Sequence, residues 1–284
     1  MAELRRYRLM PIAFNAGHHA LEESDPTWDE HVRGLHDQGR AEMIERLRFV
    51  HGQANLEAVI QNIRDLGSDP WSTIGWHLQL WMEVRHAFVS GAYFPAAVGA
   101  GALAERVLNH LLIDLADDCA TEEDREAIAH ERAPTYGRAL GILRRWDVLE
   151  PQAVDHFERL WALRNSLVHF DATLYGDPRG RSLEAVRCLR DALDSQFGVL
   201  VQRRLIPGTP GMIYARKAVE AEPFFRRYIQ PVAMHVSPRH GIAMDPTTGG
   251  WVVTVEEPVE AEEDTDEEFV RHLHPLGPPV PESG

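Results

Sequence analysis

A change of hydrophobic period at residues 206–211 divides the chain into two parts that must fold differently. Before this segment, apolar residues recur at spacings of three and four, which is the pattern of amphipathic helices. The segment itself reads Ile-Pro-Gly-Thr-Pro-Gly, and its prolines and glycines stop any helix. After it, short runs of apolar residues predict strands over 212–218, 232–236, 241–244 and 251–255. The sequence therefore predicts a mainly α protein with a small C-terminal β appendage.

The helical part is expected to consist of a bundle over residues 71–205, preceded by an N-terminal helical extension over residues 1–70. Apolar stripes and helix-start residues place the individual elements. Helices are predicted over 25–50, 56–66, 72–91, from Pro95, from Thr121, over 135–146, from Pro151 and over 182–204. The β appendage is placed at 206–255, with a hairpin turn at 245–250.

The charge of the chain is concentrated near its C-terminal end. The net charge is −15, which argues against a generic nucleic-acid coat protein, because such proteins are usually basic. A dense acidic run over 256–268 is followed by a segment rich in proline and glycine. We expect residues 256–284 to form a disordered, solvated tail.

Cysteine content and hydropathy bear on the compartment. The two cysteines, Cys119 and Cys188, make neither a disulfide framework nor a metal-binding CxxC pair, which favours a reducing cytoplasm. The basic N-terminal residues are not followed by an apolar region, so no secretory signal is expected. No stretch is expected to reach the apolar length of a membrane span, so no membrane partner is predicted.

Arg164 occupies an unusual place in the helix that begins near Pro151. At 100° per residue it lies in the middle of an apolar stripe. That stripe is formed by Phe157, Leu160, Trp161, Leu167 and Val168. A guanidinium stays protonated and is costly to bury unpaired, so Arg164 has a dedicated partner, or the stripe faces a site or a second subunit.

Two further side chains with useful chemistry lie beside Arg164. Asn165 and His169 are four residues apart and share the adjoining face of the helix. A fixed cation, an amide and an imidazole together suit acid/base chemistry at a phosphate. A structural interpretation stays open, in which Arg164 pairs with a helix carboxylate and His169 complements the helix dipole. Glu105 is the carboxylate expected to orient Arg164, unless it is an ordinary exposed residue.

These residues resemble the signature of the HEPN superfamily (higher eukaryotes and prokaryotes nucleotide-binding). Arg164, the polar Asn165 and His169 match its arginine and histidine with four intervening residues. Residues 93–97, leading into 103–112, look like the second helix of bacterial members. The resemblance covers roughly residues 71–205. It implies a HEPN-like helical bundle that forms a homodimer, with the site where two bundles meet.

The resemblance also implies an activity, namely metal-independent cleavage of RNA to 2′,3′-cyclic phosphate ends without a cofactor. His169 would be the general base on the ribose 2′-hydroxyl, and Arg164 would stabilise charge on the phosphoryl oxygens. Asn165 would position His169 or the phosphate, with Glu105 and Ser166 in supporting roles. DNA would be excluded because it lacks the 2′-hydroxyl.

The family further implies a role in toxin or phage-defence biology, with an antitoxin or regulatory protein as a possible partner. Asp171 stands where many members paired with a nucleotidyltransferase antitoxin carry a tyrosine, so regulation through that tyrosine is not expected. One alternative is a non-catalytic module that dimerises and binds RNA or a protein. Another is a sensor of a phosphorylated small molecule, with Arg164 as its phosphate clamp.

Other groupings carry weaker signals. The spacing of His18, His19, Glu22 and Glu23 fits no metalloprotease motif, so no metal site is predicted. Surface positions are expected for His235, His240, His272 and His274. Core positions, rather than base-stacking platforms, are expected for Trp71, Trp76 and Trp81.

Overall fold

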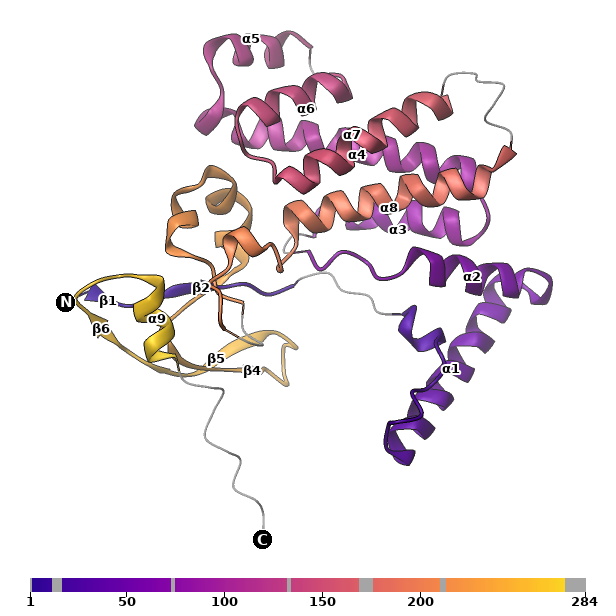
Figure 1. Cartoon of the computed structure of the whole chain (residues 1–284), viewed down its shortest axis with the longest axis horizontal. Helices are drawn as coiled ribbons and strands as arrows, with labels where there is room; N and C mark the ends of the chain where they lie inside the picture. Colours follow the sequence, from indigo (N-terminus) through magenta and orange to yellow (C-terminus); the bar gives the residue numbers. More distant parts are fainter. Residues whose placement is uncertain are drawn as a thin grey trace. The chain divides into compact units, whose positions relative to one another are not determined.

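The chain forms two compact units in a computed structural model (Figure 1). One unit is helical and covers Ile12–Gly198, and the other combines Met1–Pro11 with Val199–Gly284. The structure describes residues 2–11, 17–72, 75–131, 134–168, 176–209 and 213–273. The prediction of a mainly helical protein with small antiparallel sheets toward the C-terminus is confirmed.

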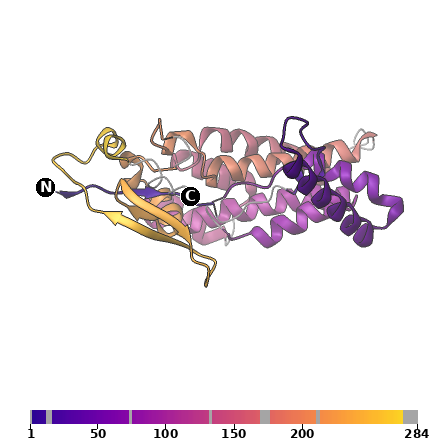
Figure 2. The ribbon, with the colours of Figure 1, turned by 90° about the horizontal axis from the view of Figure 1, so that it is seen from below.

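The helical unit is built around one long helix, α4. In sequence order the unit contains η1 (His19–Leu21), α1 (Glu30–His51), η2 (Gln53–Asn55), α2 (Leu56–Leu66), α3 (Leu78–Val89), α4 (Tyr93–Cys119), α5 (Glu122–Glu131), α6 (Tyr136–Arg145), α7 (Pro151–Val168) and α8 (Pro178–Phe197). Helix α4 packs against α3, α6, α7 and α8, and α7 lies along α8 (Figure 2).

Helix α4 corrects the expectation that no segment reaches the apolar length of a membrane span. Its 27 residues are long and apolar enough, by length and composition, to cross one. In the structure this apolarity serves the bundle, because Leu108, Leu111 and Leu112 are fully buried between helices. Each such side chain contributes about 1.5–3 kcal/mol through burial.

Side-chain caps fix several helix starts where the sequence predicts them. At the start of α5, the hydroxyl of Thr121 accepts from the Asp124 amide at 3.2 Å, which confirms the capping signal. Helix α8 begins at Pro178, four residues earlier than the predicted Ser182. The reason is that Asp177 caps it, with its carboxylate accepting from the Gly180 amide at 2.8 Å.

The predicted boundary at residue 70 differs from the observed units. The Asn62 side chain of α2 donates to the carbonyls of Phe88 and Val89 at 3.2 Å, which joins α2 to the end of α3. Ser72 pairs with Gly198 through an isolated bridge. Residues 17–70 therefore belong to the same unit as the bundle, and only the first eleven residues belong elsewhere.

The three tryptophans expected in the core have different environments. Trp81 is 4% exposed and donates its indole N–H to Asp69 at 3.1 Å. Trp76 packs edge-on against Phe197 at 5.8 Å between ring centroids. The core prediction is wrong for Trp71, which is 37% exposed. It lies between α2 and α3, where no helical stripe directs it inward.

The second unit is made of three two-stranded antiparallel sheets and short helical turns. Strand β1 (Ala2–Glu3) pairs with β6 (Glu260–Ala261), β2 (Arg6–Arg8) with β3 (Met234–Val236), and β4 (Arg239–Met244) with β5 (Trp251–Glu257). The turns are η4 (Gln202–Arg204), η5 (Lys217–Ala221), η6 (Phe225–Ile229) and η7 (Gln230–Val232), and α9 covers Asp266–His272. The hairpin turn predicted at 245–250 joins β4 to β5, as the Asp245 amide donates to the Gly250 carbonyl.

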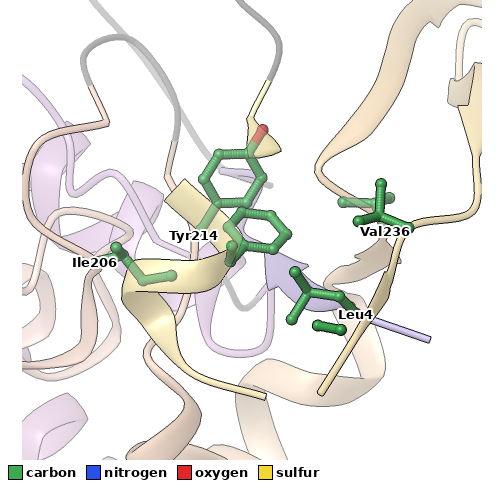
Figure 3. Packing of buried hydrophobic residues seen from close by; sticks show 7 residues of the cluster. Leu4, Ile206, Tyr214 and Val236 are labelled. Carbon is green, nitrogen blue, oxygen red and sulfur yellow. The ribbon is translucent and has the colours of Figure 1, made fainter. Parts of the chain in front are cut away.

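Residues from both ends of the chain form the hydrophobic core of this second unit (Figure 3). Leu4 comes from the N-terminal segment, and Tyr214 and Val236 come from beyond residue 199. Phe269 of α9 is fully buried and packs edge-on against Tyr214 at 4.9 Å between ring centroids. The appendage predicted at 206–255 is therefore incomplete without the first strands and α9.

The prediction of a disordered tail from residue 256 is wrong for residues 256–273. This acidic segment forms the end of β5, β6 and α9. Two of its carboxylates pair with Arg6, which is 0% exposed and binds Asp264 at 2.5 Å and Asp266 at 3.0 Å. Thr265 caps α9 by accepting from the Glu268 amide at 3.1 Å. Residues 274–284, with His274, lie outside the described residues.

Candidate functional site

Arg164 of α7 lies against Gly101 of α4. A Cβ atom placed on Gly101 of α4 would lie 2.5 Å from Cγ of Arg164 and 3.0 Å from its Cβ. The aliphatic stem of Arg164 therefore rests directly on the backbone of α4, where only a glycine leaves room. This contact fixes the position of the stem that carries the guanidinium. It also explains how an arginine fits into the apolar stripe of α7, because the stem itself is apolar.

Among the described residues, the guanidinium of Arg164 has two partners, both at long distance. Its Nη2 lies 3.5 Å from Oε2 of Glu105, and its Nη1 donates to Oδ1 of Asn165 at 3.3 Å. Strong charge-assisted hydrogen bonds are shorter, at about 2.7–2.9 Å. The side chains of Arg164 and Glu105 are 33% and 32% exposed. Within the described part of the chain, Glu105 thus orients Arg164 without saturating it, and some guanidinium N–H groups have no partner there.

The other predicted site residues are placed as follows. Asn165 turns its amide oxygen to Arg164. The Ser166 hydroxyl donates to the Leu163 carbonyl at 2.8 Å, so it is used within its own helix. His169 and Asp171 lie outside the described residues, which stop at Val168 and resume at Gly176. The structure thus brings Arg164, Asn165 and Glu105 together.

Trp161 is an exposed aromatic residue one turn before Arg164. Sequence reasoning placed it in the inward stripe of α7, but it is 39% exposed. Its ring stacks on Tyr136 at 6.4 Å between centroids and 7° between planes. It also lies on Gly137, where an added Cβ would come within 2.6 Å of it. The three-residue spacing to Arg164 was the available signal that both side chains share one face.

Tyr136 makes this stacking platform rigid. It is 2% exposed, and its hydroxyl donates to the carbonyl of Phe157 at 2.9 Å. Burial raises the pKa of Tyr136, Cys188 and Glu105 raise it further, and Arg164 lowers it. The platform and the arginine therefore belong to one cluster on α4, α6 and α7, which we call the Arg164 cluster (Glu105, Tyr136, Trp161, Arg164 and Asn165).

The clustered arginines on α8 serve the structure of the helical unit. Arg179 binds the side chains of Asn62, at 3.0 Å, and Asp65. Arg187 donates to the carbonyl of Asp65, and Arg190 to that of Leu66. These are the last carbonyls of α2, which cationic side chains satisfy favourably. These arginines therefore hold α8 against the end of α2.

A second polar group lies at the start of α3. His77 has a backbone φ of +67°, which is unusual for a residue with a side chain. Its Nε2 lies 2.8 Å from Nδ1 of His110 on α4, and the two rings stack. Burial, with His110 and Arg106 nearby, lowers the pKa of His77 to about 4. His77 is therefore neutral near pH 7 and shares one hydrogen bond with His110.

Comparison with known proteins adds no assignment to this geometry. The chain matches no protein-family model, no curated protein and no solved structure.

Proposed function

We propose that the protein is a metal-independent endoribonuclease of HEPN type, with Arg164 as its phosphate-binding residue. The observation that carries the proposal is the state of this arginine. Its stem is fixed on Gly101, while its guanidinium keeps two long contacts and remains one-third exposed. A purely structural arginine would be expected to form shorter bonds. A preorganised cation with donors to spare suits the charge that develops on a phosphoryl group.

The proposed reaction uses His169 as general base. His169 removes the proton of the ribose 2′-hydroxyl, and the oxygen attacks the adjacent phosphorus. The bond from phosphorus to the 5′-oxygen breaks, leaving a 2′,3′-cyclic phosphate and, after protonation, a 5′-hydroxyl. Arg164 stabilises the phosphoryl oxygens, and Asn165 holds the guanidinium or the phosphate in place.

The exposed Trp161 supports RNA as the substrate. An aromatic face beside an arginine can stack one unpaired base while the guanidinium holds the neighbouring phosphate. Tyr136 and Gly137 hold the Trp161 ring against α6, so the Trp161 side chain loses little conformational entropy when a base stacks on it. We therefore propose a single-stranded RNA segment as the substrate, in the cytoplasm.

We further propose that the Arg164 cluster meets its equivalent in a homodimer. Tryptophan and arginine are the residue types that contribute most to protein interfaces, and both are exposed here. Two Arg164–His169 pairs would then face one RNA across a two-fold axis. A toxin or phage-defence role, with a regulatory partner protein, would suit such an enzyme.

The test is RNA cleavage by purified protein in EDTA. A mixed RNA pool is incubated with wild type, Arg164→Ala, His169→Ala and Trp161→Ala. The matched control is Arg159→Ala, which removes an α7 arginine that pairs with Glu184 outside the cluster. We expect wild type and the control to leave cyclic-phosphate ends, and the Arg164 and His169 variants to lose at least about 100-fold in rate. Equal cleavage by all variants would overturn the proposal.

The second candidate is a non-catalytic module that dimerises or binds RNA through the same cluster. The ion pair of Arg164 with Glu105 favours it, because a partnered arginine also has a structural use. This function predicts no cleavage by folded wild type, but loss of dimer or of RNA affinity in Trp161→Ala. Light scattering and RNA titration separate the two functions. Two cavities of the described residues, of about 400 and 450 Å³, are lined by residues other than Arg164.

A further inference from the structure

Two adjacent histidines and a glutamate come together just before α1. His18 precedes the η1 turn, His19 is its first residue, and Glu22 follows it. Each offers a ligand atom, and these atoms all lie within 4.8 Å of one another. Nδ1 of His19 is 3.2 Å from Oε2 of Glu22, and the two imidazole rings are 3.8 Å apart between centroids. The tight turn creates this proximity, which the sequence spacing alone did not predict.

The coordinating capacity of the cluster is not used up by the protein. Nδ1 of His18 is buried and has no hydrogen-bond partner among the described residues. Leaving such a nitrogen unsatisfied costs free energy that a bound ligand would recover. The other two side chains face solvent, with His19 62% and Glu22 55% exposed. An ion can therefore reach His19 and Glu22 from solvent, beside the buried Nδ1 of His18.

The backbone that carries the three ligands is held by two helices. Leu21, inside the turn, is 1% exposed. Its carbonyl accepts from Arg40 of α1 at 3.3 Å and from Arg64 of α2 at 2.6 Å. The turn is thus fixed at its centre, with the ligands on either side. Supported ligands of this kind favour metal binding, because less chain must be ordered when the ion arrives.

We propose that His18, His19 and Glu22 bind a divalent transition metal ion of the Zn²⁺ class. Two imidazole nitrogens and one carboxylate oxygen suit Zn²⁺, whereas Mg²⁺ and Ca²⁺ prefer oxygen ligands. Three protein ligands leave a position for water. The bound ion closes the turn before α1, which Arg40 and Arg64 already hold against α1 and α2, and it takes no part in RNA cleavage.

The charges around the cluster set the expected affinity. Glu22 supplies one negative charge, and Arg85 and Arg190 are near enough to act on His18. These cations oppose a second cation, so we expect a dissociation constant on the order of micromolar rather than nanomolar.

The test is calorimetric titration of tag-free, EDTA-treated full-length protein with Zn²⁺, and separately with Mg²⁺. We expect one Zn²⁺ per chain and no Mg²⁺ binding, with affinity reduced at least about 10-fold in His18→Ala and in His19→Ala. The matched control is His31→Ala, which removes an exposed histidine of α1 outside the cluster and should bind as wild type does. Circular dichroism checks that every variant is folded.

Absorption of the Co²⁺-loaded protein gives an independent readout. Four-coordinate Co²⁺ produces visible absorption bands, and His18→Ala and His19→Ala should lose them. Absence of Zn²⁺ binding, or equal affinity in His18→Ala, His19→Ala and His31→Ala, would overturn the proposal. RNA cleavage in EDTA does not depend on Zn²⁺ binding, so the metal-site proposal and the nuclease proposal are tested independently.

Discussion

Arg164 in the helical unit and Arg6 in the second unit are both arginines among apolar residues, yet they are held very differently. Arg6 is 0% exposed and is bound by two carboxylates, those of Asp264 and Asp266, at 2.5 and 3.0 Å. Arg164 is one-third exposed, and the carboxylate that it binds among the described residues, Glu105, lies at 3.5 Å. A saturated, buried arginine is committed to the fold. A positioned arginine with long contacts remains available to something outside the chain.

The largest expected effect concerns how much Arg6 and Arg164 each contribute to the stability of their units. Arg6→Met keeps the stem but leaves Asp266 without its cation, whereas Lys217 still pairs with Asp264 at 2.6 Å, so we expect the second unit to lose about 3 kcal/mol in free energy of unfolding. Arg164→Met should cost the helical unit less than about 1 kcal/mol, because its pair is partly exposed. Hydrogen exchange resolved by peptide measures each unit separately. Similar losses in both variants would break the comparison.

The next effect tests how Arg164 is positioned. Gly101→Ala places a Cβ 2.5 Å from Cγ of Arg164, so α4 and α7 must move apart or the arginine must shift. We expect a loss of about 1–3 kcal/mol in unfolding free energy, together with reduced RNA cleavage. Gly141→Ala in α6 is the matched control, since nothing lies within 4 Å of its added Cβ. If both alanines were tolerated equally, the close approach would not position Arg164.

The smallest effect concerns His77, a partly buried titratable residue of the helical unit that is hydrogen-bonded to His110. Its pKa of about 4 lies below the ordinary 6.5, so the unfolded chain binds a proton between these values and the folded chain does not. Stability is therefore fully present above pH 6.5 and falls as the pH decreases toward 4. Because His77 is only partly buried, solvent screening reduces the expected loss to about 1–2 kcal/mol.

Unfolding measured from pH 7.5 to 4 checks this prediction. His77→Asn accommodates the positive φ and removes the titration, so its stability should depend less on pH. His31→Asn replaces an exposed histidine of α1 and should keep the wild-type slope. Parallel slopes in wild type and His77→Asn would show that His77 is protonated without cost to the fold.

Local signals in the sequence predicted much of the fold. Thr121 and Pro151 marked helix starts correctly, and the 245–250 turn lies between β4 and β5. The pairing of Arg6 with Asp264 spans 258 residues, and no local composition reveals it. The acidic run was therefore misread as a tail, although the spacing of Thr265 and Glu268 was a capping signal available in the sequence.

The Arg164 cluster was predicted only in part, because local signals in the sequence do not show how neighbouring helices pack. Helical periodicity was sufficient to identify Arg164 and Asn165 as neighbours, and the proximity of Glu105 followed from the expected packing of two helices. The exposure of Trp161 did not follow, because it depends on how closely Gly137 lets α6 approach α7. Periodicity gives the face of a helix, but the neighbouring helix decides how much of that face is covered.

The pairing of β1 and β2 with strands beyond residue 230 has a consequence for synthesis. Residues 12–198 are inserted between the two halves of the second unit, so they can fold as soon as they leave the ribosome. The first strands must wait, unpaired, until β3 and β6 have been made. A chain interrupted after residue 198 would retain the Arg164 cluster but would present the edges of β1 and β2 to chaperones and proteases.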